Sequence, residues 1–140
     1  MGRLRSWLRL PARERRSVLA ALGAVIAVRV LLWLLPYRLV LQTVHATARS
    51  PRGRSAPSDA VAHRIARDVG RAARVVPRAS CLVQALAGEW LMVRAGARVA
   101  LRYGVAFGER GFEAHAWLES DGRVILGGEE AARFAPLRSP

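Results

Sequence analysis

Two stretches of the chain decide its fold: ASCLVQALAGEWLMVRAG at residues 79–96 and EAHAWLESDGRVIL at residues 113–126. In the first stretch, apolar residues recur at helical spacing, and the glycine at its end supplies a stop signal. This stretch therefore predicts a helix that begins near Ser80 and runs to about Ala95. Its apolar face comprises Leu82, Leu86, Trp90 and Val93.

After this helix the pattern of apolar residues changes from helical to alternating. From residue 98 to residue 105, apolar side chains alternate with alanine and arginine, which predicts a strand. Residues 113–119 are predicted to form a second strand. Ser120-Asp121-Gly122 has the composition of a tight hairpin turn, so residues 123–126 follow as a third, antiparallel strand.

A linker and a further helix precede these elements. Residues 49–58, RSPRGRSAPS, contain Pro, Gly, Ser and Arg and no apolar side chain larger than alanine, which indicates a boundary or loop. Asp59 then offers an N-cap, and an amphipathic helix is predicted from there to just before Pro77. Its apolar stripe comprises Val61, Ile65, Val69, Ala72 and Val76.

The order of helices followed by a strand meander predicts the α+β class, with helices packed on one face of a small antiparallel sheet. The chain has 140 residues, a length that suits one domain. We expect three parts: a basic and apolar helical region at residues 1–48, a linker at 49–58, and a region at 59–140 that carries the candidate catalytic residues.

The net positive charge of the chain comes entirely from its first half. All 23 basic residues are arginine, and the formal net charge is +13. Up to Arg78 there are 16 arginines and three acids, and from Ala79 onward there are seven of each. A basic half suits a nucleic acid, an anionic membrane surface or an acidic peptide. The sequence has no zinc-spaced Cys/His set and no glycine-rich phosphate loop, so we expect neither a nucleic-acid partner nor a metal.

Residues 18–35 form an apolar segment interrupted by Gly23 and Arg29, behind arginines at positions 13, 15 and 16. Three interpretations are open. A membrane span needs about 20 apolar residues, and a central arginine costs it about 2.5–3.5 kcal/mol. The segment could also be a signal peptide, but the cleavage-like triplet at residues 46–48 is weak and lies far downstream of it. The third interpretation is a helix docked on the domain or on a partner, touching the membrane surface through its basic flank.

Cys81 is the single cysteine of the chain, so it is either an inert core residue or a nucleophile. The predicted helix places it in the first turn, where unpaired backbone N–H groups and the helix dipole stabilise a thiolate. The thiolate is the nucleophilic form of the side chain. This position suits a nucleophile, but by itself it leaves both interpretations of Cys81 open.

His115 is predicted on the central strand of the meander, between two alanines that leave room for the cysteine helix and a substrate chain. Alone, such a histidine is better explained as a hydrogen-bonded core residue. A cysteine at a helix N-terminus, then a strand, then a histidine on the next strand is the layout of papain-like and transglutaminase-like thiol enzymes. In those enzymes the imidazole accepts the thiol proton and later protonates the leaving amine.

The residues around this pair resemble one family in particular. PRASCLVQALAGEWLMVRAGARVALRYGV from Pro77, followed by AHAWLESDGRVI from Ala114, is similar to the transglutaminase-like leader peptidase of lasso-peptide gene clusters, the protease half of the lasso-peptide B protein. The apolar helix that ends in Leu-Pro-Tyr-Arg at residues 35–38 is similar to the first helix of that family. The resemblance thus extends over most of the chain.

This resemblance implies a cytoplasmic bacterial cysteine peptidase that cleaves the leader from a ribosomally made precursor. It also implies three partners: the precursor leader peptide, a separately encoded leader-recognition protein, and an ATP-dependent lasso cyclase that closes the ring afterwards. ATP would serve the cyclase, and no cofactor is implied for this chain. The apolar helix would belong to the fold of the enzyme, with membrane contact through residues 18–35 as an alternative.

The third catalytic position departs from the family pattern, which often places an aspartate about where Gly127 stands here. Glu129, two residues on, is one alternative acid. Asp121, in the hairpin turn, is the other. A dyad whose imidazole is oriented by a backbone or amide group is also compatible with the sequence.

Two further residues have candidate roles beside the pair. Gln84, one turn after Cys81, is a candidate oxyanion donor that would assist the Cys81 backbone N–H. Trp117 is predicted on the same strand face as His115, where it would shield the imidazole from water. Two rival functions keep the same fold: a non-catalytic partner-binding module, and an acyltransferase that uses the same cysteine and histidine.

Overall fold

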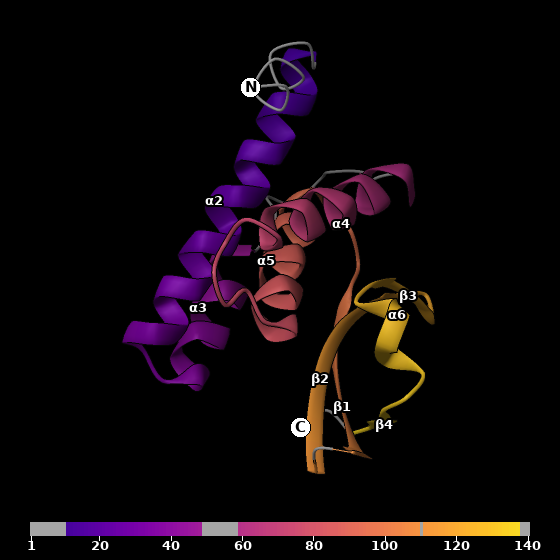
Figure 1. Cartoon of the computed structure of the whole chain (residues 1–140). Coiled ribbons are helices and arrows are strands. Elements are labelled where there is room, and N and C mark those ends of the chain that lie inside the picture. Colours follow the sequence, from indigo (N-terminus) through magenta and orange to yellow (C-terminus); the bar gives the residue numbers. More distant parts are fainter. Residues whose placement is uncertain (1–10, 49–58, 110, 138–140) are drawn as a thin grey trace, which may run out of the picture.

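The computed structural model describes residues 11–48, 59–109 and 111–137, so the linker expected at 49–58 lies outside the described residues. Helices precede a small sheet, as Figure 1 shows. The helices are α2 (Ala12–Leu34), α3 (Tyr37–Ala48), α4 (Asp59–Ala73), α5 (Cys81–Arg94) and α6 (Gly128–Ala131). The strands are β1 (Ala100–Gly108), β2 (Gly111–Ser120), β3 (Arg123–Leu126) and β4 (Ala135–Pro136).

The elements form layers. α2 and α3 lie on one side, α4 and α5 lie between them and the sheet, and α6 lies against the opposite face of the sheet (Figure 1). This arrangement confirms the predicted α+β class. One hydrophobic core joins the four long helices, and its fully buried members include Val25 of α2, Val40 of α3, Val69 of α4 and Leu86 of α5.

Pro36 separates α2 from α3. Leu35, the residue before it, has φ −124° and ψ 150°, because a residue that precedes proline is disfavoured in the helical region. The stop at Pro36 was expected from the sequence, whereas α3 was not recognised as a separate helix. The tyrosine that begins α3 is hydrogen-bonded through its hydroxyl to the hydroxyl of Tyr103 on β1, which ties the N-terminal helices to the sheet.

The two central helices begin close to the predicted residues. Ser80 caps α5, with its hydroxyl accepting a hydrogen bond from the backbone N–H of Val83 at 3.4 Å. Gly96, with φ +95°, follows the last turn as predicted. α4 ends at Ala73, three residues earlier than expected, and the chain continues in tight turns toward Pro77 because proline restricts the residue before it.

The sheet has the strand order β3-β2-β1-β4, so the strand that carries His115 is flanked by β1 and β3. Gly104 of β1 lies opposite His115. The hairpin between β2 and β3 turns at Asp121 and Gly122, whose φ values are +48° and +75°. Two successive positive φ values are typical of the tight turn that the Asp-Gly pair predicts. The short β4 was not predicted.

Alternate residues of β2 contact different layers. Ala116 and Leu118 are buried against α5 and neighbouring residues, whereas Trp117 is buried with Ala131 and Phe134 on the other side of the sheet. The segment from α6 to β4 therefore covers the face of β2 that points away from α5. His115 is two residues before Trp117 and shares its face of β2, so its imidazole lies on the side of the sheet that points away from α5.

Candidate active site

Cys81 is the first residue of α5, and its side chain is partly exposed. The helix begins here because the Ser80 side chain replaces an intrahelical partner for one of the first backbone N–H groups. The sulfur thus lies at the positive end of the helix dipole, the location that was predicted from the sequence.

The imidazole of His115 is oriented by a backbone carbonyl. Its Nε2 atom lies 2.9 Å from the carbonyl oxygen of Gly127. A carbonyl oxygen only accepts hydrogen bonds, so Nε2 must carry the proton. In the neutral ring, Nδ1 is then the basic nitrogen, free to accept a proton from a thiol.

Gly127 stands at about the position where the sequence resemblance led us to expect an aspartate. Its φ is +81°, and a Cβ atom built there would lie 3.2 Å from both the Ala116 carbonyl oxygen and the Trp117 Cβ. A residue with a side chain would therefore be strained here. The backbone oxygen of Gly127 performs the orienting contact that a side-chain oxygen would otherwise make.

Two aromatic rings flank the imidazole. The Trp117 ring lies 6.0 Å from the His115 ring at an interplanar angle of 21°, and the Phe134 ring lies 5.0 Å from it at 25°. The position of Trp117 agrees with the predicted strand face. Phe134 was missed, because it follows a short helix in a segment that has no regular apolar period.

The indole of Trp117 is itself fixed. Its Nε1 donates to Oε1 of Glu119 at 2.8 Å, and Arg102 pairs with the other oxygen of that carboxylate at 3.1 Å. The indole hydrogen bond is the main cause that lowers the pKa of Glu119 below its ordinary value. The carboxylate therefore stays charged near neutral pH and holds the indole in place.

Cys81 and His115 line the same open cavity, of about 630 Å³. They reach it from different sides of the sheet, because the imidazole stacks on the Phe134 side and α5 packs on the other. The ladder between β2 and β3 ends at the pair Leu118–Leu126 and so stops short of His115. The cavity lies beside the part of β2 that does not pair with β3.

No hydrogen bond joins the thiol to the imidazole within the described part of the chain. In thiol enzymes without substrate this contact is often long, and it shortens when substrate binds.

Gln84 lines this cavity and a second one, of about 600 Å³, that also includes His115. Its Nε2 donates to the Ala79 carbonyl oxygen at 3.1 Å, which holds the amide beside the helix N-terminus. The amide has a second N–H that this bond does not use. Its placement is compatible with the predicted role as an oxyanion donor.

The two candidate acids lie in different places. Glu129 lines the second cavity with His115, although the imidazole is bonded to Gly127. Asp121 lines a separate cavity with His63, at the far end of the β2–β3 hairpin. The structure therefore brings Glu129 near the imidazole and leaves Asp121 outside the shared cavities.

Charged groups line the walls of both shared cavities. Arg67 of α4 and Arg74, the residue that follows α4, line the second cavity. In the first cavity Arg133 pairs with Glu113 at 3.4 Å. Within residues 11–48, 59–109 and 111–137, no group of three or more His, Cys, Asp or Glu residues could hold a metal ion.

A cysteine at a helix N-terminus and an oriented histidine on the adjacent strand define the class of papain-like and transglutaminase-like thiol enzymes. The sequence profile of the transglutaminase-like superfamily matches residues 22–139, and the chain belongs to this superfamily, which includes cysteine peptidases and transglutaminases. The match includes most of α2. Neither a curated protein nor a solved structure gives a significant match.

Proposed function

We propose that the protein is a cysteine peptidase that removes the leader from a ribosomally made lasso-peptide precursor. The observation that carries this proposal is the cavity shared by Cys81 and His115, with the proton of the imidazole fixed on Nε2 by Gly127. The superfamily supports thiol chemistry. The leader as substrate rests on the sequence resemblance around the pair.

The reaction follows the ordinary course of thiol proteolysis. Nδ1 of His115 takes the thiol proton, and the thiolate of Cys81 attacks the scissile carbonyl carbon. The developing oxyanion accepts hydrogen bonds from the backbone N–H of Cys81 and from the Gln84 amide. The imidazolium then protonates the leaving amine, the C–N bond breaks, and the leader remains attached to Cys81 as a thioester. A water molecule, deprotonated by the imidazole, attacks this thioester and releases the leader as a free acid and the thiolate of Cys81.

The proposed partners follow from the same resemblance. A leader-recognition protein would deliver the precursor, and a lasso cyclase would use ATP to close the ring after cleavage. The protein would act in the cytoplasm. The cationic wall formed by Arg67 and Arg74 suits a substrate or partner with acidic residues near the cleavage site.

The test is to incubate the full chain with precursor and recognition protein and to follow leader release by mass spectrometry. Cys81→Ala and His115→Ala should each abolish release. His63→Ala removes an exposed histidine and should leave release unchanged. Cleavage that persists in Cys81→Ala would refute the mechanism.

One observation favours a non-catalytic module as the second candidate: the imidazole is stacked on Phe134, and no hydrogen bond joins it to the thiol within the described residues. Iodoacetamide separates the two. A catalytic Cys81 should be alkylated near neutral pH much faster than in His115→Ala. Equal alkylation rates in the parent protein and in His115→Ala, together with no leader release, would favour the binding module.

Acyl transfer to an amine is a further outcome that the same assay detects. A fluorescent primary amine added to the reaction would compete with water for the thioester. Release of the leader with the amine attached would identify an acyltransferase, and release as a free acid would identify a peptidase.

A further inference from the structure

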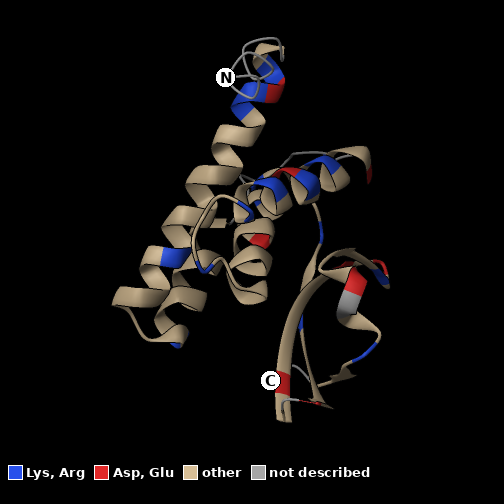
Figure 2. Ribbon diagram, in the orientation of Figure 1, with Lys and Arg blue, Asp and Glu red and all other residues tan. Residues whose placement is uncertain are grey.

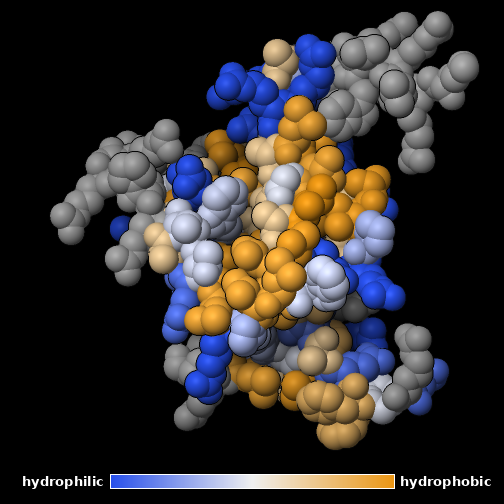
Figure 3. Space-filling view, turned by 90° about the vertical axis from the view of Figure 1, so that its left-hand side faces the viewer, coloured by the Kyte–Doolittle hydropathy of each residue, from blue (hydrophilic) through white to orange (hydrophobic). Residues whose placement is uncertain are grey.

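α2 is apolar on both of its faces. Its inner face is buried in the core through Ala21, Ala24, Val25 and Val28. Its opposite side, called the outer face here, exposes large apolar side chains at helical spacing: Leu19, Ile26, Val30, Trp33 and Leu34. Figure 3 looks onto this side and shows the hydrophobic surface as a continuous area.

The exposure on the outer face is large. Trp33 is 76% exposed and Leu34 is 63% exposed. A helix that is apolar all round is ordinarily covered on all sides, and a large continuous apolar patch marks a site of interaction. The outer face therefore requires a partner that the helices of this chain do not supply within the described residues.

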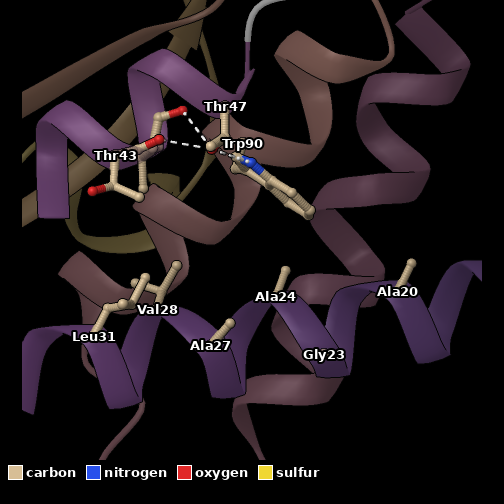
Figure 4. A pocket seen from close by; sticks show the side chains of 10 residues that line it. Ala20, Gly23, Ala24, Ala27, Val28, Leu31, Thr43, Thr47 and Trp90 are labelled. Atoms are coloured by element: carbon tan, nitrogen blue, oxygen red, sulfur yellow. Dashed lines mark hydrogen bonds between the residues drawn. The ribbon is translucent and has the colours of Figure 1, made fainter.

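Two hollows border the outer face. One, of about 390 Å³, lies between α2 and α3, and its walls are small or apolar side chains such as Gly23, Ala27 and Leu31 (Figure 4). Trp90 closes it, with its indole N–H donating to the Thr47 hydroxyl at 3.0 Å. The apolar lining of this hollow suits an acyl chain.

The second hollow, on the other side of the outer face, is apolar and cationic. It has a volume of about 750 Å³ and is lined by Ile26, Val30 and Trp33 together with Arg29 and Arg78. Apolar side chains beside guanidinium groups suit a ligand that is both apolar and anionic. An anionic phospholipid has both properties.

Further arginines stand at the N-terminal end of the outer face. Arg15 and Arg16 precede Leu19 by four and three residues and so share its helical stripe. Figure 2 shows basic residues gathered at this end of α2. From Ala12 to Ala48 there are five arginines and one acid, Glu14.

We propose that the outer face docks the protein on an anionic phospholipid surface, with α2 lying in the plane of the interface. Arginines at one end, Trp33 at the other and an apolar face between them are the features of an interfacial helix. Aromatic side chains such as Trp33 are favoured at the level of the headgroups.

α2 is also long and apolar enough to cross a bilayer by the criteria of length and composition alone. A spanning orientation, however, would remove Val25 and Val28 from the core that they share with α4 and α5. Docking in the plane keeps this core intact and covers only the outer face. The observations therefore favour docking on the surface.

The surface of a protein partner is the main rival. Such interfaces ordinarily have a rim of both charges around an apolar centre. The described charged residues that line the two hollows are Arg29 and Arg78, both positive. The charge around the outer face thus complements a surface of uniformly negative charge.

The experiment is co-sedimentation of the full chain, prepared without detergent, with vesicles of phosphatidylcholine alone or mixed with phosphatidylglycerol. The protein should sediment with the anionic vesicles and bind the neutral ones roughly tenfold more weakly. High salt should release it. Binding that resists high salt would refute docking in the plane of an anionic surface.

Two matched pairs of variants locate the contact. Trp33→Gln should weaken vesicle binding several-fold, whereas Phe107→Gln, which removes an 87% exposed ring from the β1–β2 hairpin, should not. Arg15→Gln/Arg16→Gln should weaken binding more than Arg98→Gln/Arg123→Gln, which removes the same charge from the sheet side. Equal effects within either pair would overturn the proposal.

Gel filtration of the same preparation distinguishes the remaining occupants. A dimer that Trp33→Gln dissociates, without any sedimentation on anionic vesicles, would show that a second copy covers the outer face. A monomer that does not sediment would also refute lipid docking. Leader release does not enter this test, so its outcome is independent of the proposed peptidase function.

Discussion

Nε2 of His115 lies 2.9 Å from the carbonyl oxygen of Gly127, so the end of β3 determines which imidazole nitrogen is basic. The group that contacts the imidazole is therefore a backbone carbonyl, and its position depends on the backbone conformation. A contact of this kind depends on φ and ψ at residue 127, and it responds to substitutions that change them.

Gly127→Ala is the first test of this contact. The φ of +81° and the contact of 3.2 Å between the new Cβ and the Ala116 carbonyl should displace the residue 127 carbonyl. We expect a loss of about 1–3 kcal/mol in the free energy of unfolding, measured by denaturant titration.

The same variant should slow leader release by more than its loss of stability explains. A purely structural role would leave the pH profile of kcat/KM in the folded variant unchanged, whereas a positioning role predicts a shift of that profile. Glu129→Gln is the matched comparison, and we expect it to retain the profile of the parent. A shift in Glu129→Gln alone would assign the orienting role to the carboxylate.

The local parts of the site were predictable from the sequence. Ser80 before Cys81 and Gly96 after the last turn are start and stop signals that act within a few residues, and α5 begins and ends beside them. The Asp121-Gly122 turn likewise depends on two adjacent residues. These features needed no knowledge of distant contacts.

The environment of His115 was not predictable in the same way. The sequence placed the cysteine helix against the face of β2 that carries His115, and this expectation was wrong. Ala116 and Leu118 are buried on the side of α5, whereas Trp117 is buried on the opposite side. Both faces of β2 carry apolar residues, so alternation alone did not identify the face that meets α5. Phe134 reaches the imidazole only because α6 and β4 fold back over the sheet. That return depends on tertiary packing of a short segment without a regular pattern.

Two arginines, one in α4 and one directly after it, predict an electrostatic effect on the alkylation of Cys81. Arg67 and Arg74 line the cavity that shares Gln84 and His115 with the cysteine cavity. A positive wall should favour an anionic reagent over a neutral one at low ionic strength, because screening is weak over about 10 Å.

The measurement is the ratio of alkylation rates of Cys81 by iodoacetate and by iodoacetamide. In Arg67→Gln/Arg74→Gln the ratio should fall roughly two- to fivefold, with little change in the iodoacetamide rate. Arg13→Gln/Arg16→Gln removes the same net charge from the end of α2 and should alter the ratio less. An equal fall in both variants would indicate a general effect of net charge.

Glu89 of α5 predicts the pH dependence of stability. Burial raises its pKa above the ordinary value of 4.5, against the attraction of His45, which is 3.2 Å away. Its Oε2 atom is buried, and it has no hydrogen-bond partner within the described residues. The folded state therefore favours the protonated acid, so this group should lose its stabilising contribution as pH rises above about 4.5.

Glu89→Gln removes the buried charge and keeps an oxygen that can accept from His45. The variant should be more stable than the parent near neutral pH by about 1–3 kcal/mol, the cost of a buried unpaired charged atom. The advantage should shrink toward low pH, where the parent carboxyl is protonated. Thermal unfolding across this pH range measures both, and a constant difference would contradict the prediction.

Gly104 and Gly70 predict opposite effects of the same substitution. Gly104 lies opposite His115, and a Cβ there would come within 2.7 Å of the Phe134 Cβ and 2.8 Å of the Trp117 ring. Gly104→Ala should therefore push apart both rings that flank the imidazole and cost about 1–3 kcal/mol in unfolding free energy.

A Cβ at Gly70, on α4, meets nothing within 4 Å. Gly70→Ala should therefore stabilise the protein by about 0.5–1 kcal/mol, because alanine loses less backbone entropy in a helix. Denaturant titration of the two variants measures both changes. If Gly104→Ala were as stable as Gly70→Ala, the rings of Trp117 and Phe134 could yield without cost, and the close packing that holds His115 in place would be refuted.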